Sequence, residues 1–364
     1  MSSPTPAPAR APRAVVPELD FYFPEGELDI RLNRLIKNAL FLGQVRYNFA
    51  KGDILALLRY RYYGLERIYE LSVFDELNFD RVEQVSNDFN RVRGGLFLVE
   101  LPIDPSHRAS FLAEVDRISS NKEEFQFTTN RTNTFLRAAY QYGTSDDTRS
   151  NALIGDQRGR IERLFTAFRR IGPEGIGLTG ALTWSFDELG ADFSYLKFEA
   201  EGLKRWQLSG GSFLVGRLHA GTFPDYDIAQ PGEAPVFLYT IPIDELFRLD
   251  GRDRLKGLDD KIYGTHEIHS TVEVFFPWFV GDSRRLLWVD WETWYWVIYG
   301  GAGQAGFAER DLGQLDDYVT DLGFGFESSF RVRGVRVFAA GVVAHALDDR
   351  GGWNVRFSLK SSSR

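Results

Sequence analysis

Histidines are the residues of this sequence best suited to binding a metal ion or carrying protons, and the chain has five of them. His266 and His269 have a spacing that resembles a pair of metal ligands. On a strand, however, residues three positions apart point to opposite faces, so these two cannot share an ion. The sequence also has no Cys, which excludes thiolate metal sites and a cysteine nucleophile. We therefore predict no metal and no other cofactor.

Sequence signatures of catalysis are missing as well. The chain has no Gly-x-Ser-x-Gly elbow, no phosphate-binding loop and no His-Glu-x-x-His motif. His219 falls on the charged face of an alternating run, where it is either a polar residue facing water or a member of a triad assembled across strands. The glycine-rich stretch 300–303 follows a strand pattern and opens no helical one, so we interpret it as a loop. We predict no catalytic residues and a protein that is not an enzyme.

Most of the chain alternates between apolar and charged side chains, which is the pattern of β-strands. Strands therefore determine where the histidines and the other polar residues lie. In the run 192–203, Leu196 and Phe198 fall on one face while Lys197 and Glu199 fall on the other. A period of two sustained over about nine to twelve residues indicates a strand. Similar runs occupy residues 39–49, 53–63, 134–142, 176–186, 213–222, 266–276 and 286–299.

Alternation alone fits two architectures. One is a soluble sandwich or propeller with its charges outside, and the other is a membrane barrel with its apolar face toward lipid and charges lining a wet lumen. The runs are longer than usual soluble strands and match the roughly 9–11 residues that a tilted strand needs to cross a bilayer. Aromatic residues near run ends, such as Tyr60, Tyr62, Trp294, Trp296 and Tyr299, fit an interfacial girdle.

Length sets the size of such a barrel. About 335 residues at roughly 21 residues per strand and loop give about 16 strands, which lies within the known range. A soluble propeller would show a repeat of roughly 40–50 residues, and none is evident. We therefore predict an all-β, transmembrane antiparallel β-barrel of about 16 strands.

Composition argues against a nucleic-acid partner and separates a proline-rich N-terminal segment from the rest of the chain. The net charge is −8, from 43 basic and 51 acidic residues, without the basic patch that nucleic-acid binding requires, so we expect no nucleic-acid partner. With 30 Phe, 15 Tyr and 8 Trp the chain is too aromatic to be disordered. Six of the 14 prolines precede residue 25. We expect residues 1–25 to form a Pro/Ala-rich N-terminal arm and residues 26–364 to form the barrel domain.

One expected connection is unusually long. Residues 224–264 contain four prolines, followed by a stretch rich in charged residues. Loops of this length are uncommon and usually functional. We expect the loop to fold into the lumen, where its basic residues would meet acidic residues on the barrel wall. The alternative is a loop exposed to solvent outside the barrel.

The tip of this loop and the two runs after it resemble the BamA/TamA family of outer-membrane assembly factors, also called bacterial surface antigens. In that family a Val-Arg-Gly-aromatic motif forms the loop tip, and Leu255-Lys256-Gly257-Leu258 matches it here with Lys in place of Arg and Leu in place of the aromatic residue. The stretch 271–277, with Glu273 and a terminal Phe-Pro, matches the next family strand, and 287–290, ending at Asp290, matches the one after. The resemblance implies a 16-stranded barrel in the bacterial outer membrane.

Glu273 and Asp290 lie on the charged faces of their runs, so we expect both to point into the lumen. Two carboxylates inside a barrel repel each other unless a cation lies between them. Lys256 is the natural candidate, with Arg252 or Arg254 as a substitute. We predict that Lys256, Glu273 and Asp290 form an ion cluster that pins the loop in the lumen. The alternative is that the three are unrelated charges in water.

The resemblance also implies a function in protein insertion or translocation, in contact with outer-membrane lipid. Family members carry POTRA domains before the barrel, where this sequence has a Pro-rich segment, so we expect a separately encoded periplasmic or outer-membrane protein partner. The family mechanism implies an imperfect seam between first and last strands, which we place between 39–49 and 353–359. The alternatives are a passive channel for small solutes and an anchor or scaffold subunit of a larger complex.

Overall fold

The computed structural model describes most of the chain as β-strand. The described residues are 16–23, 27–36, 38–49, 52–64, 67–80, 88–104, 106–120, 131–143, 175–224, 241–242, 245–249, 255–258, 262–286, 289–307, 312–314, 317–332, 335–348 and 352–362. Within these ranges, two short 3-10 helices, η2 (Asp187–Leu189) and η3 (Ser209–Gly211), lie in connections between strands. No helix in these ranges has the length and apolar character needed to cross a membrane.

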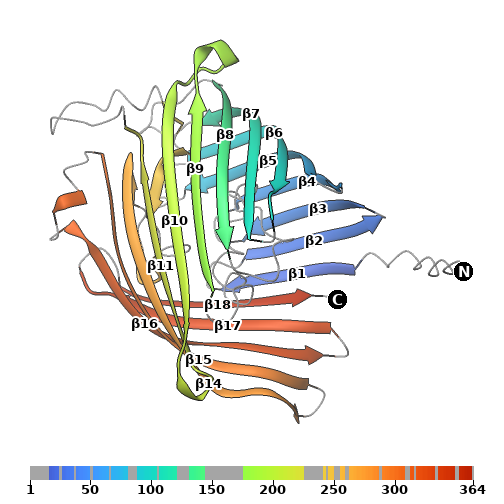
Figure 1. Ribbon diagram of the computed structural model, residues 1–364, viewed down its shortest axis with the longest axis vertical. Coiled ribbons are helices and arrows are strands. Elements are labelled where there is room, and N and C mark those ends of the chain that lie inside the picture. Colours follow the sequence, from blue (N-terminus) through green and yellow to red (C-terminus); the bar gives the residue numbers. More distant parts are fainter. Residues whose placement is uncertain are drawn as a thin grey trace, which may run out of the picture.

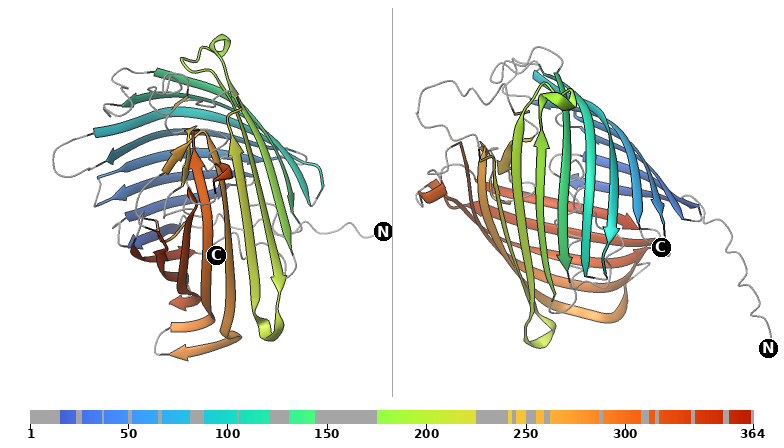
Figure 2. Two further views of the ribbon diagram at one scale, coloured as in Figure 1. Left: turned by 90° about the vertical axis from the view of Figure 1, so that its left-hand side faces the viewer. Right: turned by 45° about the horizontal axis from the view of Figure 1, so that its top comes forward.

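Within the described ranges, sixteen strands form one antiparallel sheet whose order closes on itself (Figures 1 and 2). They are β1 (Val16–Phe23), β2 (Glu27–Ile36), β3 (Ala39–Asn48), β4 (Ile54–Tyr63), β5 (Ile68–Asp80), β6 (Asp88–Pro102), β7 (His107–Ser120), β8 (Arg131–Gly143), β9 (Ile176–Ser185), β10 (Tyr195–Gln207), β11 (Phe213–Thr222), β14 (His266–Leu286), β15 (Val289–Gly306), β16 (Val319–Val332), β17 (Val335–Ala346) and β18 (Trp353–Ser362). The small strands β12 (Phe247–Leu249) and β13 (Ile262–Gly264) pair with each other in the connection from β11 to β14. The prediction of an all-β barrel of about 16 strands is confirmed.

The direction of the strands places the long connection. Each strand runs antiparallel to its neighbours around the barrel, and their number is even, so β1 begins and β18 ends at the same end of the barrel. By the same alternation, β11 ends and β14 begins at the opposite end. The connection between them, residues 223–265, therefore begins and ends at the end of the barrel that is far from both terminal strand ends.

The two faces of the wall have opposite chemistry. Phe198, Leu218 and Val272 expose 43%, 53% and 46% of their surface, whereas the alternate residues Lys197 and Glu273 expose 4% and 5%. The reverse would hold in a soluble sandwich, whose charged face is the one in water. The prediction that the apolar face points outward and the ionic face points inward is confirmed, and this is the arrangement of a barrel surrounded by hydrocarbon.

Outward-facing aromatic residues gather over β14, β15 and β16. Trp296 stacks on Trp278 and on Phe324, with ring centroids 6.3 and 5.4 Å apart. Tyr299, which the sequence grouped with this girdle, instead faces the interior and is 1% exposed. The physical reason is that the long connection occupies the interior beside β15, so an apolar ring can be buried there as well as on the lipid face.

The barrel begins earlier in the chain than the sequence predicted. Val16–Phe23, within the segment expected as an arm, is strand β1, while residues 1–15 and 24–26 lie outside the described residues. β1 pairs with β18 over four residues of each strand, whereas β2 and β3 pair over ten. The seam therefore lies between β1 and β18. Its expected place between 39–49 and 353–359 is wrong, because β3 lies between β2 and β4.

The glycine-rich stretch 300–303 lies within β15, so its interpretation as a loop is wrong. Two of its glycines face the interior, where the absence of a side chain leaves room for neighbouring groups. A Cβ atom added at Gly301 would lie 2.5 Å from the hydroxyl of Tyr299, and one added at Gly303 would lie 2.5 Å from the Cβ of His269. Since such contacts are too close, these positions need glycine. The space beside Gly301 is occupied by Tyr299 and Asp321, and the space beside Gly303 by His269.

Candidate functional site at the tip of the lumenal connection

The tip of the connection between β11 and β14 is a buried turn. Leu258 N donates a hydrogen bond to Leu255 O at 3.1 Å, which closes a β-turn with Lys256 and Gly257 at its centre. Leu255 and Leu258 are 0% exposed and pack with further apolar residues of the connection and the wall, namely Leu249, Ala305 and Val319. The two leucines anchor the turn, so its central residues face the inner wall.

Lys256 is the charged residue of the tip, and it contacts β14 and β15. Its Nζ forms an ion pair with Oε1 of Glu273 and lies 4.1 Å from the centroid of the Tyr299 ring. Its backbone N donates a hydrogen bond to the Tyr299 hydroxyl at 3.3 Å. Lys256 and Glu273 are both 5% exposed. Since a buried charge without a partner is strongly unfavourable, each of these two residues needs the other.

Gly257 and Leu258 extend the contacts to the last three strands. Gly257 N donates to Oδ2 of Asp321 on β16 at 2.8 Å, and Asn354 Nδ2 on β18 donates to Leu258 O at 3.2 Å. A Cβ atom added at Gly257 would lie 2.5 Å from the backbone N of Ala346 on β17. With the two contacts of Lys256, the tip touches five consecutive strands, β14 to β18, from the inside.

A second attachment holds the earlier part of the connection. Lys197 Nζ on β10 donates to Glu245 O at 2.8 Å and lies 3.4 Å from the Glu245 carboxylate. The same ammonium group lies 4.8 Å from the centroid of the Phe247 ring. Leu246 and Phe247 belong to an apolar cluster inside the barrel that includes Phe74, Val92, Leu98, Leu112, Phe135 and Phe223. The connection is therefore attached to the inner wall at two separate places.

The structure brings together the four tip residues and Glu273, but it does not bring Asp290 to them. Tyr299 is the register partner of Glu273, and Asp290 lies nine positions before Tyr299 on β15, about 30 Å along a strand. Asp290 is exposed and lies opposite Arg331 of β16 in the register. Its predicted place in the ion cluster is wrong, and Asp321 is the second carboxylate at the tip. Residues 252 and 254, the suggested substitutes for Lys256, lie outside the described residues.

Asp321 was missed although a signal for it exists. Its strand reads Asp321-Leu322-Gly323-Phe324, and Leu322 and Phe324 are exposed on the outer face. The alternation therefore places Asp321 on the inner face. What the alternation does not give is the height of a residue along the barrel axis, which decides whether two inward residues meet.

Ion pairs also line the inner wall away from the tip. Glu100 accepts from Arg61 and, at 3.1 Å, from Arg108, while Arg59 lies 3.0 Å from Glu70. All five side chains are largely shielded from bulk water. These five side chains, three arginines and two glutamates, form an ionic cluster on the inner face of β4 to β7.

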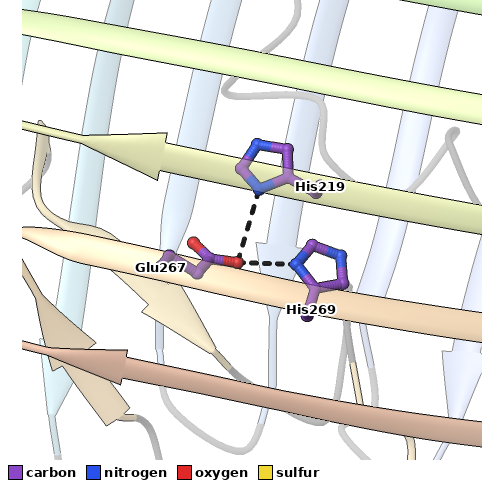
Figure 3. A group of neighbouring side chains, drawn as sticks. All are labelled: His219, Glu267 and His269. Carbon is purple, nitrogen blue, oxygen red and sulfur yellow. Dashed lines mark hydrogen bonds and ion pairs between the residues drawn. The ribbon is translucent and has the colours of Figure 1, made fainter. Parts of the chain in front are cut away.

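Within the described residues, one group has the composition of a metal site: His219, Glu267 and His269 (Figure 3). His266 is not part of it and instead lies 2.8 Å from the Thr222 hydroxyl through its Nδ1. The spacing of His266 and His269 concerns one strand alone and does not include the neighbouring strand. His269 meets its imidazole partner across the pairing of β11 with β14.

Comparisons with known proteins identify the fold. No protein-family model matches the chain, and no curated protein matches it in sequence. Its structure is similar to that of BamA from Haemophilus ducreyi lacking POTRA domains 1–3, with a TM-score of 0.65 over 95% of this chain and 69% of that chain. It is also similar to CdiB from Escherichia coli (0.66, over 97% and 63%) and to CdiB from Acinetobacter baumannii (0.61, over 95% and 59%).

These three similarities show a shared fold. Sequence identity is 10% in each case, which is too low to carry more than the architecture. The chain spans about six tenths of the length of the two CdiB chains. The protein is therefore a β-barrel of the kind found in BamA and CdiB.

Proposed function

We propose that this protein is a barrel of the bacterial outer membrane that inserts or translocates proteins, and that the turn 255–258 holds the long connection inside its lumen. The observation that carries the proposal is the tip itself, which binds β14, β15, β16 and β18 from within through a buried ion pair and hydrogen bonds and packs against β17 at Gly257. A segment attached in this way occupies space that an open pore would leave to water.

Four further features support this function. The fold is shared with BamA and CdiB, and the residues at the tip match a motif of the BamA/TamA family, to which we propose the chain belongs. β1 and β18 pair over only four residues of each strand, so few backbone hydrogen bonds oppose separation at that seam. The outer face is apolar, as contact with outer-membrane lipid requires. A periplasmic or outer-membrane protein encoded separately would then be its partner.

Locking the seam tests this function. Because the sequence has no Cys, a pair of cysteines at the register partners Phe21 and Leu359 would be the only one in the chain. We expect the protein in liposomes to accelerate folding of an unfolded outer-membrane barrel, and oxidation of this pair to abolish the acceleration. A matched pair at Val343 and Val355, which are partners in β17 and β18, should leave it unchanged. Absence of any acceleration by the unmodified protein would contradict an insertion function.

The second candidate is a passive channel, for which the charged residues on the inner face of β4 to β7 speak. Single-channel conductance in planar bilayers separates the two candidates. If the connection blocks the lumen, conductance is low and rises when Lys256→Ala releases the tip. Lys204→Ala is a suitable control, since Lys204 has the same charge and lies on β10 away from the tip. High conductance in the unmodified protein, unaffected by Lys256→Ala, would favour the passive channel.

A further inference from the structure

Three metal-binding side chains meet on the inner face where β11 and β14 pair (Figure 3). His219 and His269 are direct partners in the antiparallel register, and Glu267 lies on the same face because it precedes His269 by two residues. Oε1 of Glu267 lies 3.6 Å from Nδ1 of His219 and 2.8 Å from Nδ1 of His269. One ligand atom from each of the three residues lies within 4.8 Å of the others.

These separations fit a single ion. Zn²⁺ binds imidazole nitrogen and carboxylate oxygen at about 2.0–2.2 Å, so two ligands of a tetrahedral site lie about 3.4 Å apart. The two observed distances, 3.6 and 2.8 Å, lie on either side of this value. Two imidazoles with one carboxylate suit Zn²⁺ and its first-row neighbours, whereas Ca²⁺ and Mg²⁺ prefer oxygen ligands throughout.

We propose that His219, Glu267 and His269 bind one divalent transition-metal ion of the zinc type. The three side chains are 5%, 0% and 3% exposed, so water competes little for the ligands. On the neighbouring strand, Gly303 has no side chain and so leaves room for the imidazole-bearing residue His269. This site is independent of the proposed function, because its ligand set and geometry do not depend on what passes through the barrel.

The earlier part of the long connection shelters the site from the lumen. Phe247 packs edge-on against His219, with ring centroids 6.4 Å apart, and its ring fills the space beside Gly221. β11 ends at Thr222 and β14 begins at His266, so the connection leaves and returns within a few residues of the ligands. A bound ion would therefore link β11 and β14 where the long connection begins and ends. The turn 255–258 attaches the same connection to the wall at a second place.

An ion bound at this place should stabilise the folded barrel. His219 and Glu267 are 48 residues apart in the sequence, and the unfolded chain does not hold them together. An ion that binds the folded barrel alone shifts the folding equilibrium toward it. We expect saturating Zn²⁺ to raise the unfolding temperature of the barrel. The competing interpretation is a hydrogen-bonded His-Glu-His network that needs no ion.

Spectroscopic titration with Co²⁺ distinguishes these interpretations. The full chain, purified without a polyhistidine tag and stripped with a chelator, is titrated in detergent micelles. We expect visible absorption bands of a low-coordinate Co²⁺ complex that saturate at one equivalent and disappear when Zn²⁺ is added. Glu267→Gln and His269→Gln should each weaken Co²⁺ binding by more than about tenfold, because each removes a direct ligand.

His345→Gln is the matched control. His345 lies on β17, with its ring stacked on Trp353, outside the proposed ligand set. This variant should bind Co²⁺ with unchanged affinity and stoichiometry. Variants that do not fold are recognised by loss of β-sheet circular dichroism, and the proposal then rests on the unmodified protein and His345→Gln. Lack of a saturable Co²⁺ spectrum in these two, or equal affinity in folded Glu267→Gln, would overturn it.

Discussion

Replacing Lys256 with Met tests whether the ion pair with Glu273 holds the tip inside the barrel. Met keeps the apolar stem and removes the charge, which leaves the buried Glu273 without this cation. Removing one partner of a buried ion pair costs about 3–5 kcal/mol. Loss of the contact with the Tyr299 ring adds about 0.5–2 kcal/mol. Since about 1.4 kcal/mol is a factor of ten, the ratio of released to docked tips should rise at least about 100-fold.

Cysteine labelling measures this ratio directly. The sequence has no Cys, so Leu258→Cys introduces a single thiol at a position that is 0% exposed. A maleimide reacts there only while the tip is released, and the labelling rate is then proportional to the released fraction. We expect Lys256→Met to raise the rate at least about 100-fold in this background. Lys204→Met, which removes the same charge from β10, should leave the rate unchanged.

The partner variant makes the test sharper. Glu273→Gln combined with Lys256→Met removes both charges, so no buried ion remains without its partner. The double variant should therefore label more slowly than Lys256→Met alone. An unchanged rate in Lys256→Met, or the same increase in Lys204→Met, would refute the reasoning that this ion pair holds the tip.

Two further variants should separate packing from charge at the tip. Gly257→Ala places a Cβ atom 2.5 Å from the backbone of β17, so we expect it to release the tip and raise single-channel conductance, whereas Gly180→Ala, with open space around it, should change neither. Asp321→Asn removes the charged acceptor of the Gly257 N–H bond and should accelerate labelling at position 258 by about tenfold, since hydrogen bonds to charged groups contribute about 1.5–3 kcal/mol. Asp290→Asn should leave that labelling rate unchanged, and an increase equal to that of Asp321→Asn would contradict the assignment of the second carboxylate.

The architecture could be predicted because its signal is local. Whether a residue faces lipid or lumen depends on its parity within one strand, and parity can be counted without knowing any other strand. Phe198 outside and Lys197 inside follow from a few consecutive residues. The same counting failed for Tyr299, because the connection that fills the interior also provides a place to bury an aromatic ring. It failed to find β1 because the Pro-rich composition of that segment conceals the alternation.

Contacts between strands need a second quantity, the register of each pair. For neighbours joined by a short turn, the register follows from counting back from the turn. β16 and β17 are an example, since Val332 and Val335 are partners across two intervening residues. Asp290 lies beside the short turn between β14 and β15, so its place opposite β14 follows from this counting. Asp321 does not, because twelve residues separate the end of β15 from the start of β16. Counting from the turn as far as Glu273 and Tyr299 also fails, because the register shifts in these strands are not marked in the sequence.

The pairing of β11 with β14 is different in kind, because 43 residues separate the two strands and no turn fixes their offset. Sliding β14 by two residues would keep every side chain on its face and yet place Thr271 rather than His269 opposite His219, with Glu267 four positions away along the pair. The face on which each side chain lies is the same in the two alignments. What differs is the set of inward polar groups that come together, and in the observed register these are two imidazoles and a carboxylate. An ion that binds this set therefore favours one register over its neighbour, in a pair of strands whose connection does not determine it.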